Sequence, residues 1–259
     1  MSEDIIAETK DGILRVVFNR PQARNAFTFA MYERLAELCR KAEADGTVRA
    51  VLFTGAGEKA FAAGTDISQF RAFATPEDAI GYEERIGRVI GAVEACPKPT
   101  IAAIAGACTG GGGAIAAACD LRIAAPNLRF GFPIARTLGN CLAMENLARL
   151  SELIGPARTI DMIFTARLIE AAEAKQIGLV HEITADIAGL MPRAEELART
   201  VAANAPLTLR ATKEALRRLR PSLAADAGRD LILMCYMSRD FREGMEAFLA
   251  KRKPVWSGT

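Results

Sequence analysis

The sequence predicts an α/β protein with parallel strands, and three observations lead to this prediction. Short apolar runs alternate with longer segments of helical periodicity through most of the chain. Glycine-rich turns follow two of the expected strands, at Gly64 and at Gly110–Gly113. After Leu190 the pattern is helical only. Strands that alternate with helices form βα units, whose strands pair in parallel.

The individual elements follow from local patterns. Thr28 is a suitable N-cap for a helix over residues 28–44, in which Met31, Leu35 and Leu38 share one face. A second helix over residues 76–95 ends before Pro97 and Pro99, and a third begins at Glu145 and runs to residue 153. We expect strands at residues 13–19, 50–54, 100–105, 121–124 and 129–132, and a small strand within 178–183.

The helical pattern after Leu190 divides the chain into a core at residues 1–189 and a C-terminal helical region at 190–259. A chain of 259 residues is long enough to bury a substantial core. We expect the C-terminal region to be an extension of that core and not a separately folded domain.

Composition excludes several classes of protein. The net charge is +2, so no overall field favours nucleic acid or a membrane surface. The six cysteines lack CxxC spacing, which argues against zinc and against disulfides. No signal peptide and no membrane span is expected, so the predicted location is the cytoplasm. Cations gather toward the C-terminus, either on solvated helix faces or around an anionic ligand: Arg210, Lys213, Arg217, Arg218, Arg220, Lys251, Arg252 and Lys253.

The glycine run Gly110–Gly113 predicts a backbone binding site. Glycine permits a close approach of a ligand to the main chain, and the first N–H groups of a helix have no partners within the helix. We expect the helix to begin at Ala114 and its N-terminus to offer donors to an anion or a polarised carbonyl. Ala114 and Ile115, which follow the glycines, carry no acid or base.

Four segments, taken together, resemble the enoyl-CoA hydratase/isomerase (crotonase) family. They are FAAGTDI at residues 61–67, IAAIAG at 101–106 with the following glycines and Cys119-Asp120, IEAAEAKQIGLV at 169–180, and REGMEAFLAKR at 242–252. The resemblance extends from Ile13 to Pro254. It implies a spiral of ββα units followed by a C-terminal helical trimerisation region. It also implies an acyl-coenzyme A thioester as substrate, no separate cofactor or metal, and a homotrimer or a hexamer of two trimers.

The resemblance implies an oxyanion hole, in which the backbone N–H groups of Ala63 and Gly111 bind the thioester carbonyl. One such donor contributes roughly 3 kcal/mol of barrier reduction where negative charge develops on that oxygen. The alternative is that the two glycine turns only allow tight strand–helix packing.

Further binding positions are carried over from the family. Arg24, Lys59 and Lys251 are candidates for the coenzyme A phosphates, with solvated surface cations as the alternative. Asp66 and Ile67 follow the loop that borders the adenine pocket, although Asp66 is equally suited to cap a helix that starts at Ser68. The remaining candidate substrate-binding residues are Gly64, Gly110, Ala114, Ile134, Arg136 and Phe248.

The chain departs from the family at both catalytic glutamates, which correspond to Ala114 and Ile134 here. Glu145 is the nearest carboxylate in sequence and is either a replacement acid/base or simply an acid in the first turn of a helix. Arg136 either pairs with a substrate carboxylate or anchors its loop. For Cys141 and Asn140 a packed thiol and a turn residue are favoured over a nucleophile and a substrate ligand. His181 lies in a structural strand of the family, which argues against a Ser-His-Asp hydrolase.

Two functions are consistent with these residues. The first is an acyl-CoA lyase or isomerase that stabilises a thioester enolate. The second is an acyl-CoA-binding protein, or an inactive partner subunit, that has kept the ligand cradle and lost the acid/base pair.

Overall fold

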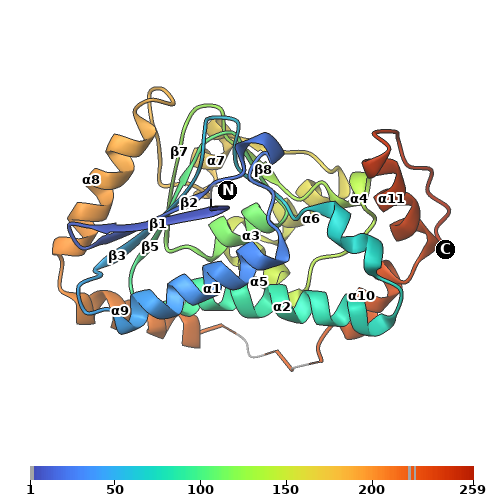
Figure 1. Ribbon diagram of the computed structural model, residues 1–259, viewed down its shortest axis with the longest axis horizontal. Coiled ribbons are helices and arrows are strands. Elements are labelled where there is room, and N and C mark those ends of the chain that lie inside the picture. Colours follow the sequence, from blue (N-terminus) through green and yellow to red (C-terminus); the bar gives the residue numbers. More distant parts are fainter. Residues whose placement is uncertain (1–2, 221–222, 225) are drawn as a thin grey trace.

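Two β-sheets form the centre of the protein (Figure 1), whose computed structural model describes residues 3–220, 223–224 and 226–259. The first sheet contains, in spatial order, β1 (Ile5–Lys10), β2 (Ile13–Phe18), β3 (Ala50–Gly55), β5 (Thr100–Ile104), β7 (Leu121–Ala124) and β10 (Glu182–Ile183). The second contains β4 (Ala60–Ala63), β6 (Ala107–Thr109), β8 (Arg129–Gly131) and β9 (Ile169–Glu170). Only β1 and β9 pair antiparallel to their neighbours in the described sheets.

From β3 to β8, consecutive strands alternate between the two sheets. In each of the pairs β3–β4, β5–β6 and β7–β8, the first strand joins the first sheet and the second strand joins the second sheet. A helix follows each pair, so the chain advances along both sheets as a spiral of ββα units. The predicted α/β class and the ββα spiral are therefore confirmed.

Helices surround the sheets and continue to the C-terminal end (Figure 1). Two short 3-10 helices lie at Pro21–Ala23 and Ile67–Ala72. The α-helices are α1 (Phe29–Ala44), α2 (Pro76–Ala95), α3 (Gly111–Ala118), α4 (Ile134–Thr137), α5 (Met144–Ile154), α6 (Pro156–Phe164), α7 (Ala171–Gln176), α8 (Leu190–Ala203), α9 (Pro206–Arg218), α10 (Arg229–Tyr236) and α11 (Arg239–Leu249).

Local capping explains where the first long helices begin. The Thr28 hydroxyl accepts a hydrogen bond from the Met31 amide, as predicted, and Met31, Leu35 and Leu38 are buried. Helix α2 begins with a reciprocal capping box between Thr75 and Asp78, and its predicted bounds are confirmed. These two helices pack against each other and bring α2 beside the glycine-rich turn of α3.

The structure corrects the sequence prediction at the glycine junction. Strand β5 does not lead directly into the turn, because Gly106 is followed by β6, which pairs with β4 and β8. Helix α3 begins at Gly111, three residues before the predicted Ala114. Strand β1 was also missed, and the last strand is only two residues long. Strands β6 and β10 pair with strands that are distant in sequence, which local sequence does not report. Strand β1 pairs instead with the adjacent β2, across the turn at Asp11 and Gly12.

Helices are the only regular secondary structure in the described residues after Leu190, as predicted, and residues 253–259 form an extended tail without helix or strand. Helix α8 lies on the first sheet, where Leu190, Ala194 and Ala198 share a core with Leu52 and Ile101. The division of the chain at residue 190 stays a prediction.

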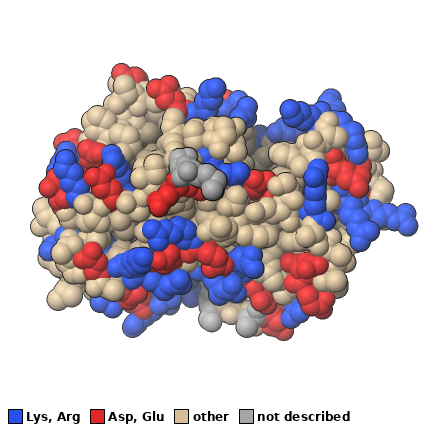
Figure 2. Space-filling view, viewed as in Figure 1, with Lys and Arg blue, Asp and Glu red and all other residues tan. Residues whose placement is uncertain are grey.

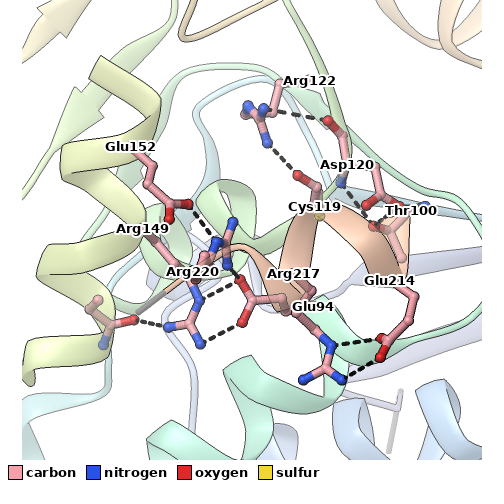
Figure 3. A network of polar contacts seen from close by, with 11 residues as sticks. Glu94, Thr100, Cys119, Asp120, Arg122, Arg149, Glu152, Glu214, Arg217 and Arg220 are labelled. Atoms are coloured by element: carbon pink, nitrogen blue, oxygen red, sulfur yellow. Dashed lines mark hydrogen bonds and ion pairs between the residues drawn. The ribbon is translucent and has the colours of Figure 1, made fainter. Parts of the chain in front are cut away.

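Ion pairs of Arg220, which follows α9, connect the C-terminal region to α2 and α5 (Figure 3). Arg220 pairs with Glu94 of α2 and with Glu152 of α5, and Arg149 pairs with Glu94 through two hydrogen bonds of 2.9 Å. Cations and carboxylates are interspersed over the face that Figure 2 shows. Arg217 and Arg218 pair with Glu214 on the same helix, as a solvated helix face predicts. Lys213 and Arg220 pair instead with Asp120 and Glu94 of the core.

Candidate active site

A cavity of about 160 Å³ lies where β4 ends, α3 begins and the buried face of α2 passes beside them. Its wall is closed by the segment around α4 and by Phe248 from α11. The sequence predicted many of its lining residues: Ala63, Gly64, Ile67, Gly110, Gly111, Ala114, Ile134 and Phe248.

Gly111 forms the floor of this cavity at the start of α3. Gly110 has φ +52° and ψ −122°, a conformation that glycine adopts without strain. A Cβ atom on Gly111 would lie 1.9 Å from the Tyr32 hydroxyl oxygen. The first hydrogen bond within α3 is donated by the Ala114 amide to the Gly110 carbonyl, so the Gly111 amide precedes the intrahelical pattern. A polar atom in the cavity can therefore approach this amide closely.

Three hydroxyl groups lie in a chain beneath Gly111. The Thr65 Oγ1 atom is 2.9 Å from the Tyr32 hydroxyl and 2.9 Å from the Tyr82 hydroxyl. Burial raises the pKa of both tyrosines well above the usual value, so both stay protonated and neutral. The chain fixes the cavity floor without placing a charge there.

The Ala63 amide has a partner in the described structure. It donates a hydrogen bond of 3.0 Å to the carbonyl oxygen of Arg24, which lies in a left-handed turn with φ +51°. The following residue, Asn25, is also left-handed and completely buried, and its side chain bonds to three main-chain groups. A ligand carbonyl at Ala63 must share this amide or replace Arg24 as its acceptor.

The positions of the two missing family glutamates both face the cavity. Ala114 is 4% exposed and Ile134 is 8% exposed, so apolar side chains occupy both places. Glu145 lies in the first turn of α5 and is exposed, and it lines a neighbouring hollow instead of this cavity. The structure therefore does not bring Glu145 to the main-chain donors.

Sequence reasoning missed Glu83, the one carboxyl group among the described residues that line the cavity. It lies on the buried face of α2 and is 8% exposed. Its Oε1 accepts a 2.5 Å hydrogen bond from the Tyr236 hydroxyl, which in turn accepts one of 3.1 Å from Asn140 Nδ2. Burial raises the pKa of Glu83 to about 7; the bond from Tyr236 opposes this and the charge of Glu145 adds to it. The sequence feature that could have identified Glu83 is the presence of a glutamate within the apolar stripe of α2.

The charged candidates from the family pattern lie outside the cavity lining. The Asp66 carboxylate accepts hydrogen bonds from the Ser68 amide and hydroxyl at the start of the 3-10 helix, so the capping interpretation is confirmed. It also pairs with Arg20 at 3.1 Å. The remaining four have exposed side chains: Arg24, Lys59, Arg136 and Lys251.

Three further residues can now be placed. Cys141 and Asn140 line the cavity, and the hydrogen bond with Cys235 together with burial raises the pKa of the Cys141 thiol. The Asn140 Oδ1 atom is buried without a partner among the described residues. His181 is distant from the cavity lining, and its Nδ1 bonds to the main chain of Arg122 on β7.

Comparison with known proteins agrees with this fold. The chain matches the family model described as enoyl-CoA hydratase/isomerase over residues 8–259. It is 36% identical to the short-chain-enoyl-CoA hydratase of Clostridium acetobutylicum, with 96% of each chain covered. It is 33% identical to the crotonyl-CoA hydratase of Syntrophomonas wolfei, with 97% of this chain and 96% of that one covered.

A solved structure gives the same result. The chain superimposes on an enoyl-CoA hydratase/carnithine racemase from Magnetospirillum magneticum with a TM-score of 0.81 and 34% identity, covering 100% of this chain and 97% of that one. The protein therefore belongs to the enoyl-CoA hydratase/isomerase family, as its sequence motifs indicated.

None of the helices in the described residues is both long and apolar enough to cross a membrane. In the same residues, no group of three or more His, Cys, Asp or Glu side chains is placed to hold a metal ion.

Proposed function

We propose that this protein is an acyl-CoA enzyme that stabilises a thioester enolate against the main chain of Gly111, with Ala63 as the second donor. The observation that carries the proposal is the cavity itself. It brings the strand end at Ala63 and the helix start at Gly111 together in a mainly apolar enclosure. A dipole-bearing helix start strengthens hydrogen bonds to an oxygen that becomes negative, and exclusion of water increases the effect.

The apolar residues at Ala114 and Ile134 favour a reaction with few proton transfers. Hydration requires groups that activate a water and protonate the α-carbon, whereas a double-bond shift requires one proton carrier. Isomerisation is therefore the preferred reaction within this proposal.

For the coenzyme A phosphates the proposal relies on exposed cations in segments that adjoin the cavity-lining residues. Arg24 lies on the turn that contacts Ala63, and Lys59 precedes β4. Phe248 is 50% exposed and lines the cavity, and Lys251 follows one turn later. We assign the nucleotide end of the substrate to these segments, with Asp66 and Arg136 beside it. The exposed apolar side chains of α9 and its end, Leu207, Leu216 and Leu219, suit the trimer or hexamer contacts that the family implies.

The second candidate is an acyl-CoA-binding protein without catalysis, and the apolar pair Ala114 and Ile134 is the observation that favours it. A panel of short 2-enoyl and 3-enoyl thioesters of coenzyme A, followed by mass spectrometry, separates the two. Calorimetric titration with butyryl-CoA runs in parallel, and free coenzyme A is the control ligand. Turnover of any panel member supports the enzyme. Clear binding with no turnover across the panel supports the binding protein, and absence of both contradicts the ligand class.

A further inference from the structure

Glu83 stands between two hollows of the molecule. It lines the cavity that contains Ala63 and Gly111, and it also lines an outer hollow formed by α2, the start of α5 and the segment before α10. We propose that Glu83 is the catalytic acid and base of this site and replaces the pair of carboxylates that is absent from Ala114 and Ile134. The inference rests on the proposed function.

Glu83 lies on the buried face of α2. Its neighbours on the buried face, Ile80, Ile86 and Ile90, anchor the helix in apolar surroundings. A buried carboxylate costs several kcal/mol unless it is paired with a cation, and no ion pair to Glu83 is present in the described part of the chain. A carboxyl group kept at such a position, facing a cavity with main-chain donors, has a chemical use there.

Two side chains, Tyr236 and Asn140, orient the carboxyl group of Glu83. Asn140 Nδ2 donates to the Tyr236 oxygen, which leaves the Tyr236 proton for Glu83 Oε1. The other carboxyl oxygen, Oε2, makes no hydrogen bond within the described residues, so it is available to the substrate. Tyr236 and Asn140 are therefore positioning residues and not catalytic ones.

The proposed step balances with one proton and no second reactant. Glu83 Oε2 takes a proton from the α-carbon of a 3-enoyl thioester. The C–H electron pair moves into the thioester as a dienolate, whose oxygen is stabilised by the Gly111 amide. The protonated Glu83 then returns the proton to the γ-carbon, and the double bond moves from the 3,4 to the 2,3 position. A carboxyl whose pKa lies near neutrality serves both directions of this transfer.

The outer hollow gives Glu83 a route to exchange its proton with solvent. The charged and titratable groups around Glu83 are Tyr32, Tyr82, Tyr236, Cys141, Glu145, Glu84, Arg88, Asp226 and Arg229. The charge of Glu145 raises the pKa of Glu83, and the bond from Tyr236 lowers it. In wild type we therefore expect the pH profile of the reaction to rise with an apparent pKa of about 7. Glu145→Gln should shift this profile to lower pH and Tyr236→Phe to higher pH, and a purely structural role would move neither.

The test is the exchange of the α-hydrogens of butyryl-CoA in deuterium oxide, followed by mass spectrometry, with calorimetric binding of the same ester. This readout needs only the base and the enolate site, so it does not depend on the physiological substrate. We expect wild-type exchange to fall roughly 100-fold or more in Glu83→Gln, with the dissociation constant changed less than about threefold. Glu83→Asp should retain part of the rate, and it serves as the second variant.

The matched control is Glu77→Gln, which removes the same charge from an exposed residue in the first turn of the same helix, outside the lining of both hollows. Its exchange rate should equal that of wild type. Exchange that survives in Glu83→Gln, or that is lost in Glu145→Gln instead, overturns the assignment to Glu83 and leaves the enolate site standing. Binding of butyryl-CoA to wild type without any exchange overturns the proposed function, and the assignment with it.

Discussion

Gly111 lies so close to Tyr32 that a side chain on the glycine would overlap the tyrosine hydroxyl. A Cβ atom there would lie 1.9 Å from the Tyr32 hydroxyl oxygen and 3.1 Å from its Cζ. Tyr32 is fully buried on α1 and cannot move outward without breaking its bond to Thr65. The first helix of the protein thereby fixes the place where the main chain of α3 meets the cavity.

This fit predicts a coupled pair of substitutions. Gly111→Ala should lower the free energy of unfolding by about 1–3 kcal/mol, because the new methyl overlaps the Tyr32 hydroxyl. Tyr32→Phe removes that oxygen, so the cost of Gly111→Ala should shrink by at least about 0.5 kcal/mol in that background. Urea unfolding of the four proteins of the double-mutant cycle measures the coupling. Strictly additive costs would show that the two groups do not collide.

The raised pKa of Glu83 predicts how the free energy of unfolding depends on pH. The folded protein keeps this proton up to about pH 7, whereas the unfolded chain loses it near ~4.3. A folded pKa that is raised makes stability highest at low pH, and this contribution is lost as pH rises through the folded pKa. The free energy of unfolding of Glu83→Gln, taken relative to that of wild type, should therefore increase by roughly 2–3 kcal/mol from pH 5 to pH 8. Urea unfolding at both pH values checks this, and Glu77→Gln should show no such trend.

The lowered pKa of Glu94 predicts the opposite pH dependence of the free energy of unfolding. Burial raises the pKa of Glu94, but the hydrogen bonds and charges of Arg149 and Arg220 outweigh it and hold the pKa below the ordinary value. Its contribution is present above the unfolded pKa and is lost as pH falls through the folded one. Glu94→Gln leaves the Arg149 side chain, 8% exposed, without its partner, and should cost roughly 3 kcal/mol at pH 7.

The control for Glu94 lies on α9. Glu214 pairs with Arg217 and Arg218, whose side chains are 46% and 75% exposed. Glu214→Gln should therefore leave the stability nearly unchanged in thermal or urea unfolding. Equal losses from Glu94→Gln and Glu214→Gln would contradict the view that burial decides the strength of these pairs.

The sequence predicted those parts of the site that depend on local chemistry. The glycines at residues 110–113 indicated the turn that lines the cavity at the start of α3, and helical periodicity gave the bounds of α2. The family resemblance placed Ala114 and Ile134 at the cavity. The Asp66 carboxylate caps the 3-10 helix and pairs with Arg20, and its place beside the adenine pocket stays a prediction.

The rest of the site depends on contacts between distant parts of the chain. Glu83 and Tyr236 are separated by 153 residues, and nothing in either local sequence reports that they meet. Glu145 was proposed because it is close in sequence to the altered loop, yet the first turn of α5 directs it to the outer hollow. A glutamate inside an apolar helical stripe was the available signal for Glu83. Strand β6 was missed for a related reason, because its three residues are held by pairing on both edges.

The proposed function requires the thioester carbonyl of an acyl-CoA to lie against the Gly111 amide and to be polarised there. Difference infrared spectroscopy of butyryl-CoA labelled with carbon-13 at the carbonyl measures this polarisation directly. We predict that the labelled carbonyl stretch moves to lower frequency on binding to wild type, because the main-chain donors lengthen the C=O bond. A bound ester whose carbonyl stretch stays at its frequency in water would contradict the account.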